Sequence, residues 1–141
     1  MTDARRVADG LGIDHHVFNY EAIFDEAVVQ PYVEAHRLGA TPNPCVECNR
    51  EVKFGALLER SRRLGFERLA TGHHARVELG SDGPALRRGA DPKKDQSYVL
   101  SVLSADQLAD LLLPIGAMTK DEVRREARRR GLRTAEQADS Q

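Results

Sequence analysis

Cys45 and Cys48 are the residues of this chain best suited to act as nucleophiles, and they lie three positions apart in the segment TPNPCVECNR at 41–50. Residues 50–64 carry apolar side chains at spacings of three and four, which predicts a helix, with Asn49 suited to begin it and Gly65 to end it. Cys48 would then lie just ahead of the helix N-terminus. Because unpaired N–H groups and the helix dipole favour negative charge there, we expect this position to favour the thiolate of Cys48.

The C-x-x-C spacing also admits other interpretations. The two cysteines could simply lie close together in a loop, or they could form half of a zinc site, which needs two further ligands. The histidine pairs at 73–74 and 15–16 are the available clusters, but adjacent histidines in a strand point to opposite faces. A thioredoxin-like redox pair normally follows a strand, whereas a proline-rich loop precedes this one. We predict no metal site, and a zinc- or redox-binding module using Cys45, Cys48 and His73 is the competing hypothesis.

Two further polar segments have the composition of a ligand site. The segment Thr71-Gly72-His73-His74 comes directly after a predicted strand at 66–70. Ligand sites of open α/β sheets lie at the carboxyl ends of strands, where a glycine lets a ligand approach the backbone. The second segment, DPKKDQS at 91–97, enters a predicted helix and offers side chains that suit phosphates and base edges. The alternatives are a plain turn with solvated histidines and a solvated helix cap.

Arginines crowd one region near the end of the chain: Arg124, Arg125, Arg128, Arg129, Arg130 and Arg133. They belong to a predicted helix that Thr119 and Glu122 open with capping-box spacing and Gly131 ends. Ion pairs four residues apart on such a helix contribute only about 0.2–0.5 kcal/mol each. The pattern is compatible with a salt-bridged solvent face and with a surface for RNA. Neither G-x-x-x-x-G-K-[ST] nor G-x-G-x-x-G occurs in the chain, so we expect no phosphate-cradling loop in it.

The composition is that of one globular domain. The chain has 141 residues, of which 40% are hydrophobic and 30% charged, and a net charge of −1. No global field would attract nucleic acid, so any such contact must use local patches. The sequence has no apolar run of membrane-spanning length and no signal-peptide pattern. Two cysteines without secretory features favour the reducing cytosol, where a stable structural disulfide is not expected.

The remaining pattern predicts alternating helices and strands. We expect a helix from Asp3 that Gly10 and Gly12 end, a strand at 13–19, a helix at 21–38 interrupted at Pro31, and a hairpin at 76–88. Further helices are predicted at 95–103 and from Ser104, which forms a capping box with Gln107, to residue 113. This alternation is typical of an α/β fold with a parallel sheet and crossover helices. Because no strand precedes the first helix, we expect the chain to begin within a fold.

Taken in order, these segments resemble the tRNA-specific 2-thiouridylase family, bacterial enzymes that thiolate the wobble uridine of certain tRNAs. The resemblance extends over essentially the whole chain. It runs through DARRVA at 3–8, TPNPCVECNREVKF at 41–54, ATGH at 70–73, KDQSY at 94–98, PIGAMTKDEVR at 114–124 and DS at 139–140. Each segment alone is a weak signal, but the ordered set is highly specific.

The resemblance implies a Rossmann-like, adenine-nucleotide hydrolase-like ATP-pyrophosphatase domain in the cytoplasm. Such an enzyme uses ATP, with Mg²⁺, to adenylate the uridine C2 oxygen, releases pyrophosphate, and receives sulfur from a cysteine persulfide. Its partners would be tRNA and a sulfur-relay or cysteine-desulfurase donor protein. By position, Cys48 resembles the nucleophile and Gly72 a nucleotide-contacting glycine. The positions that resemble tRNA contacts are Asn43, Pro44 and Cys45, which approach the target base, together with His73, Lys94, Asp95 and Gln96.

The chain departs from the family in two places. The N-terminal strand and its SGGVDS phosphate loop should precede Asp3, and the second, persulfide-carrying cysteine should follow Ser140. Relatives differ at the position of Cys45, and some carry an acidic residue there. We therefore expect residues 1–141 to be a partial ATP-pyrophosphatase (PP-loop type) domain, truncated at both ends, with the hairpin at 76–88 as an insertion. Such a fragment should be inactive alone; an inactive α/β scaffold that only docks to partners is the third hypothesis.

Overall fold

The computed structural model describes residues 2–132 and residue 135, so Arg133 and the segment 139–140 lie outside the described residues. The labels η1 and η2 mark π-helical stretches, whose backbone bonds span five residues. The elements in chain order are α1 (Thr2–Leu11), α2 (Glu21–Phe24), η1 (Asp25–Val29), α3 (Gln30–Arg37), α4 (Pro44–Glu47), η2 (Cys48–Leu57), α5 (Leu58–Arg63), β1 (Leu69–Ala70), β2 (Ala75–Gly80), β3 (Gly83–Arg88), α6 (Ser97–Leu100), α7 (Ala105–Ala109), β4 (Leu111–Leu112) and α8 (Lys120–Arg129).

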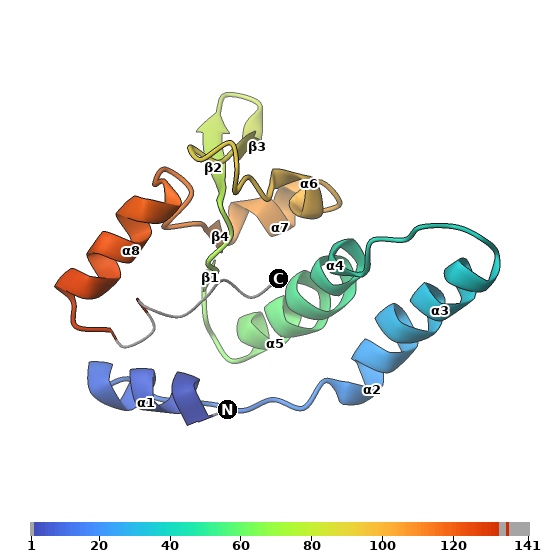
Figure 1. Ribbon diagram of the computed structural model, residues 1–141, viewed down its shortest axis with the longest axis horizontal. Coiled ribbons are helices and arrows are strands. Elements are labelled where there is room, and N and C mark those ends of the chain that lie inside the picture. Colours follow the sequence, from blue (N-terminus) through green and yellow to red (C-terminus); the bar gives the residue numbers. More distant parts are fainter. Residues whose placement is uncertain (1, 133–134, 136–141) are drawn as a thin grey trace.

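One long helix, made of α4, η2 and α5, crosses the middle of the molecule (Figure 1). Helices α2 and α3 lie on one side of it, and the strands with α6 and α7 lie on the other. Helix α8 lies beyond the strands, and α1 is joined to α2 by an extended segment along the lower edge of the view. The long helix therefore separates the N-terminal helices from the strand-bearing half of the molecule.

The strands form two pairs. β1 pairs in parallel with β4, with Leu69 opposite Leu111 and Ala70 opposite Leu112. β2 and β3 form the antiparallel hairpin predicted at 76–88. The α/β class with parallel strands and flanking helices is therefore confirmed. The parallel pair brings the chain after Ala70 and the chain after Leu112 to the same end of the sheet.

The main hydrophobic core lies between the long helix, the start of β2, and the helices α6 and α7. Apolar side chains from four separate parts of the chain meet there because each element buries only one face. The buried members are Phe54, Ala75, Val99, Leu100, Leu103, Leu108 and Leu111. This packing fixes the long helix against the ends of β1 and β2, where the polar segments begin.

The long helix begins at Pro44, not at Arg50 as the sequence predicted. Asn43 has an extended backbone, and its side-chain oxygen accepts a hydrogen bond from the Cys45 N–H at 3.0 Å. Pro44 occupies the first turn, where a missing N–H costs nothing. Asn49, which we expected to cap the helix, lies inside it and is 2% exposed. The apolar pattern that begins at Phe54 concealed the earlier start, whereas the predicted stop at Gly65, with φ of +86°, is correct.

The π-helical turns of η2 explain why Asn49 and Phe54, five residues apart, both lie on its buried face. In an α-helix this spacing would place them on different faces, whereas backbone bonds that span five residues bring them together. Gly55 suits this geometry, because a methyl group there would lie 2.9 Å from the Arg50 carbonyl oxygen. The same kind of turn precedes Pro31, so the predicted interruption is absent and helical structure runs from Glu21 to Arg37. Proline clashes with the carbonyl four residues earlier, and a wider turn moves that carbonyl aside.

Two predicted strands differ from the structure. Residues 13–19, which include His15 and His16, form no strand; Ile13 and Val17 remain exposed, and no described strand pairs with this segment. Phe18 fixes the segment instead, with the guanidinium of Arg60 4.2 Å from the centre of its ring. The strand predicted at 66–70 is reduced to β1, because only Leu69 and Ala70 face a partner.

The predicted helices after the hairpin are shorter than expected. The helix predicted at 95–103 is the single turn α6, and the helix expected to reach residue 113 ends at Ala109. Leu111 and Leu112 pair with β1, so tertiary pairing overrides the helical pattern there. Both predicted capping boxes are present, at Ser104 with Gln107 and at Thr119 with Glu122. The predicted ends of α1 at Gly12 and of α8 at Gly131, both with positive φ, are also correct, whereas Gly10, which we expected to help end the first helix, lies inside α1.

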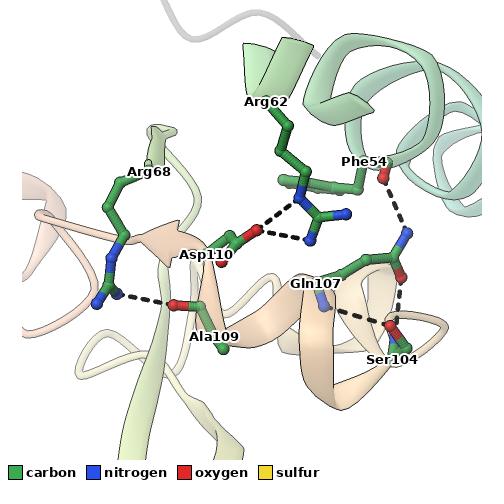
Figure 2. A network of polar contacts seen from close by, with 7 residues as sticks. All are labelled: Phe54, Arg62, Arg68, Ser104, Gln107, Ala109 and Asp110. Atoms are coloured by element: carbon green, nitrogen blue, oxygen red, sulfur yellow. Dashed lines mark hydrogen bonds and ion pairs between the residues drawn. The ribbon is translucent and has the colours of Figure 1, made fainter. Parts of the chain in front are cut away.

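Helix α7 is bound to the long helix by polar contacts as well as by the core (Figure 2). Gln107 accepts from the Ser104 N–H at 2.9 Å and donates its amide to the Phe54 carbonyl oxygen at 2.8 Å. Arg62 of α5 donates to Asp110 at 2.7 Å, at the end of α7. Gln107 therefore caps one helix and satisfies a carbonyl of another with a single side chain.

We expect Gln107→Glu to lower the free energy of unfolding by about 1–3 kcal/mol, because a glutamate keeps the cap but has no N–H to donate to the Phe54 carbonyl. Urea unfolding measures this change. The matched control is Glu122→Gln, which keeps the cap of α8 and should have a much smaller effect, because within the described part of the chain the Glu122 side chain bonds only to Thr119 and Arg125 of its own helix and cap. Equal stability of the two variants would contradict the cross-helix role of Gln107.

We expect Gly116→Ala to be strongly destabilising, at or beyond the upper end of the roughly 1–3 kcal/mol typical of overpacking. A methyl group at Gly116 would lie 1.7 Å from the Ala75 carbonyl oxygen, so the backbone must move. Gly10→Ala in α1 is the control: its methyl group meets nothing within 4 Å, and we expect it to raise stability by roughly 0.5–1 kcal/mol. The two thermal midpoints should therefore shift in opposite directions.

Candidate functional site

The chain leaves β1 directly into the polar segment 71–74. The Thr71 N–H donates to the Leu112 carbonyl at 3.0 Å, which extends the parallel pairing by one bond. Gly72 follows, and a methyl group there would meet only the Ile115 side chain, at 4.0 Å. Gly72 therefore has open space beside its backbone at the carboxyl end of a parallel strand, as a ligand-contacting glycine requires.

His73 is held against the long helix. It is 8% exposed, its Nδ1 lies 2.9 Å from the Thr71 hydroxyl, and its ring centre lies 5.9 Å from that of Phe54. Burial, with a smaller contribution from the Lys53 charge, lowers the pKa of His73 from 6.5 to about 4. His73 is therefore a neutral side chain at neutral pH, suited to hydrogen bonding and not to charge pairing.

The segment 91–97 lies beside His74 and is hydrogen-bonded to its backbone through Gln96. The His74 N–H donates to Gln96 Oε1 at 3.0 Å, and the Gln96 N–H donates to the His74 carbonyl at 2.9 Å. A methyl group at Gly89 would lie 2.5 Å from that same carbonyl, so the chain approaches closely there as well. The two polar segments predicted separately from the sequence thus form one structural unit.

Two carboxylates fix the shape of this segment. Asp91 accepts from the backbone N–H groups of Lys120 and Lys93, each at 3.0 Å, and these bonds hold its pKa below the ordinary value. Asp95 accepts from the Gly89 N–H at 2.8 Å and from the Ser97 hydroxyl at 2.9 Å. Burial opposes ionisation of Asp95, but these hydrogen bonds prevail and lower its pKa. Asp95, predicted to contact tRNA, therefore uses its oxygens within the loop.

A cavity of about 390 Å³ opens between these segments and the turn before α8. Its wall contains four of the predicted residues: Gly72, Lys94, Asp95 and Gln96. The sequence analysis did not select the other lining residues: His74, Lys93, Tyr98, Ile115 and Lys120. KDQSY and PIGAMTK contain three of these five positions, Tyr98, Ile115 and Lys120, so the ordered motifs held a signal for them that single-residue reasoning missed.

The cysteines lie on the long helix. Cys45 is exposed in its first turn, Cys48 is partly buried one turn further, and both are free thiols. Cys48 is therefore inside the helix and not ahead of it, and the N–H of Cys45 in the first turn is bonded to the Asn43 side chain. Asn49 donates to the Cys45 carbonyl at 2.9 Å, while the other side-chain atom of Asn49, Oδ1, has no partner among the described residues.

The cysteine helix and the cavity belong to neighbouring elements. Phe54, six residues after Cys48, contacts His73, and helix α6, which begins beside the cavity, packs against α4 and η2. Asn43, Pro44 and Cys45 lie together at the start of the long helix, whereas Lys94, Asp95 and Gln96 lie on the cavity side. The predicted residues thus form two groups, connected through the Phe54–His73 contact.

Other predicted features have a clear outcome. In residues 2–132 and 135, no group of three or more His, Cys, Asp or Glu side chains could hold a metal ion, so the zinc hypothesis finds no support.

On α8, Glu126 bonds to both Arg129 and Arg130, and these bonds lower the pKa of Glu126 to about 2. That part of the arginine run is a salt-bridged solvent face. Over the same described ranges, no helix has the length and apolar character needed to cross a membrane.

The fold and the polar groups after β1 define an α/β domain with a candidate ligand site at the carboxyl end of a parallel strand. The family model described as "tRNA methyl transferase HUP domain" matches residues 1–141, and the chain belongs to this family. The motifs of the chain resemble those of tRNA-specific 2-thiouridylases. A comparison with curated relatives finds proteins of that name.

Three of these relatives are named tRNA-specific 2-thiouridylase MnmA. The protein from Sorangium cellulosum is 55% identical over 139 residues, which are 99% of this chain and 36% of the relative. The protein from Geobacter metallireducens is 53% identical over 140 residues, covering 99% of this chain and 38% of its own length. The protein from Thermobifida fusca is 51% identical, with 98% and 37% covered. The chain thus spans less than two fifths of the length of the relatives it matches.

The lowered pKa of His73 predicts a pH dependence of stability. The unfolded chain binds a proton at His73 below pH 6.5 but the folded chain only below about 4, so this stability is complete above 6.5 and is lost as the pH falls toward 4. Urea midpoints measured across this range should fall for the wild type and remain flatter for His73→Gln. His16→Gln, a change at an exposed histidine, should retain the wild-type slope. The contributions of Asp91 and Asp95 are lost below pH 3.8, outside this window.

Proposed function

We propose that this chain acts in tRNA 2-thiolation, as the part of a 2-thiouridylase that carries the nucleophilic cysteine. In the proposed reaction ATP adenylates the C2 oxygen of the wobble uridine and pyrophosphate is released. The terminal sulfur of a cysteine persulfide then bonds to C2 and displaces that oxygen, which leaves on AMP; the Cys48 thiolate breaks the remaining S–S bond and forms a disulfide with the donor cysteine, so 2-thiouridine is released. The observation that carries the proposal is the match of 98–99% of this chain, at 51–55% identity, to proteins named tRNA-specific 2-thiouridylase.

Cys48 has the role of nucleophile in this proposal. It is a free thiol, and its partial exposure on the long helix is compatible with access to a substrate. Asn43, Pro44 and Cys45, which would approach the target base, form the first turn of the same helix, so the base and the thiol would be held by one rigid element. Some relatives carry an acidic residue at the position of Cys45. Because this chain has a cysteine there, we assign no proton-transfer role to that position.

ATP would lie with its phosphates toward the cavity. Gly72 leaves space beside the backbone, and three lysines, Lys93, Lys94 and Lys120, line the wall. These residues fit an anionic phosphate group, which ATP supplies as the leaving pyrophosphate. Mg²⁺ would arrive with the nucleotide, because this ion is held mainly by phosphates and one or two carboxylates. His73, Lys94 and Gln96 would contact tRNA, with Asp95 holding their loop in shape.

The other parts of the proposal concern the whole protein. We infer that residues 1–141 form part of a PP-loop ATP-pyrophosphatase domain, with the hairpin β2–β3 as an insertion. A sulfur-relay or cysteine-desulfurase protein would supply the persulfide sulfur, and the reaction would take place in the cytoplasm. The relatives' names, which mention tRNA and thiolation, support the substrate and the group transferred.

A chimera tests this function in a complete protein. Residues 1–141 replace the matching segment of the Sorangium cellulosum relative, and the wobble nucleoside is analysed by mass spectrometry after incubation with tRNA, ATP, Mg²⁺ and a sulfur donor. We expect 2-thiouridine from the chimera and a loss of at least about a hundredfold in rate with Cys48→Ser, because a hydroxyl cannot carry or accept sulfur as the thiolate does. Cys45→Ser is the matched comparison at the other thiol and should lose far less activity, because a serine can still lie against the target base.

Two outcomes would contradict the proposal. Full thiolation by Cys48→Ser would remove the nucleophile assignment, and a methylated in place of a thiolated nucleoside would show a different group transfer. Circular dichroism of both serine variants distinguishes lost chemistry from lost folding.

A further inference from the structure

His74 is a buried histidine whose ring has no polar contact within the described residues. The side chain is 5% exposed, and neither Nδ1 nor Nε2 finds a hydrogen-bond partner in ranges 2–132 and 135. Its backbone N–H and carbonyl, in contrast, are both bonded to Gln96. Buried polar atoms are nearly always satisfied, and an unsatisfied pair next to a cavity indicates a group that enters from outside. This observation is independent of the family motifs.

The cavity that His74 lines is rich in donors. Three lysines, Lys93, Lys94 and Lys120, contribute to its wall against one carboxylate, that of Asp95. The oxygens of Asp95 already accept from the Gly89 and Ser97 backbone and from the Ser97 hydroxyl. What the wall presents to a ligand is therefore positive charge and N–H groups, which favours an anion over a cation.

Among the described residues, the carboxylate of Asp91 also interacts with His74, whose ring helps to lower the pKa of Asp91. Asp91 does not line the cavity, and both its oxygens accept backbone N–H groups, from Lys93 and from Lys120. It therefore positions the lysine-bearing segments and does not supply a hydrogen bond to the His74 ring. The buried His74 ring therefore remains without a hydrogen-bond partner among the described residues.

We propose that the cavity binds a phosphate group and that a ring nitrogen of His74 donates a hydrogen bond to it. This inference rests on the proposed function, since phosphate would reach the cavity on the backbone of an RNA or on a free nucleotide. Both ring nitrogens are covered in the structure, so a side chain of the cavity wall has to rotate when phosphate binds. Tyr98, 59% exposed, offers an aromatic face beside these donors on which the base of the same nucleotide could stack.

His74→Phe is the informative variant, because it keeps a buried ring of similar size and removes both unpaired nitrogens. We expect the thermal midpoint to stay the same or rise, since replacing an unpaired polar group by an apolar one relieves a desolvation penalty. We also expect affinity for a phosphate ligand to fall about tenfold, as for a lost hydrogen bond to a charged group. His16→Phe, in the exposed segment before α2, is the matched control and should leave binding unchanged.

Binding is measured on the purified chain by calorimetry with three probes: inorganic pyrophosphate, ATP and an anticodon stem-loop RNA. Two-dimensional ¹H–¹⁵N spectra of the imidazole groups follow the His74 ring, which is assigned by the loss of its signals in His74→Phe. A His74 shift with RNA alone would identify backbone phosphate as the ligand, and a shift with ATP or pyrophosphate alone would identify the free nucleotide.

An unchanged His74 signal with all three probes would overturn the proposal, and so would equal affinity of wild type and His74→Phe. A lower thermal midpoint of His74→Phe with intact binding would show a purely structural role and would overturn it as well. These readouts need no thiolation, so a failed thiolation assay with intact phosphate binding would count against the proposed function alone.

Discussion

The site depends on how the backbone of the segment 89–97 is held without a sheet or helix of its own. Its N–H groups near the cavity must find acceptors, and side-chain oxygens provide them: Asp91 for Lys93 and Lys120, and Asp95 for Gly89 and Ser97. One carboxylate thus ties the segment to the start of α8, and the other closes its own turn. Because the two carboxylates accept these backbone N–H groups, they hold the backbone that carries the lysines of the cavity wall in place.

This arrangement connects to the cysteines through packing. His73 contacts Phe54 on the long helix, and Gln107 bonds to the Phe54 carbonyl from the other side. Phe54 is 1% exposed, so neither contact can shift without disturbing the core. The first turn of the helix, with Cys45, and the strand end, with Gly72, are therefore set by a shared buried residue. A rigid link of this kind suits a reaction in which a base and a nucleotide must meet a thiol.

Local signals in the sequence were reliable where the cause of the structure is local. Both capping boxes, the stops at Gly12, Gly65 and Gly131, and the hairpin follow from neighbouring residues alone, and the structure contains them. The ordered motifs also led to the family, which an isolated C-x-x-C could not have done.

The errors arose where distant parts of the chain decide the structure. Leu111 and Leu112 form a strand only because β1 lies beside them, and the segment 13–19 lacks such a partner among the described residues. The start of the long helix was missed because Asn43 and Pro44 precede any apolar repeat. In the site, His74 could not be selected from its sequence neighbours, because its significance comes from a cavity formed with residues some twenty and forty positions away.

The π-helical geometry of the cysteine helix has a consequence for its tolerance of length changes. A turn closed by bonds across five residues holds one residue more than an α-helical turn, and η2 extends from Cys48 to Leu57. Deleting a single residue there would allow an ordinary helix to form while leaving Phe54 and Leu58 in the core. Asn49 and Phe54 would then lie four residues apart, about 400° around an α-helix of 3.6 residues per turn, so they and the upstream thiols would keep nearly the same orientation about the helix axis. The wider turn thus lets the helix hold one extra residue while keeping the register between the sulfur atoms and the strand end.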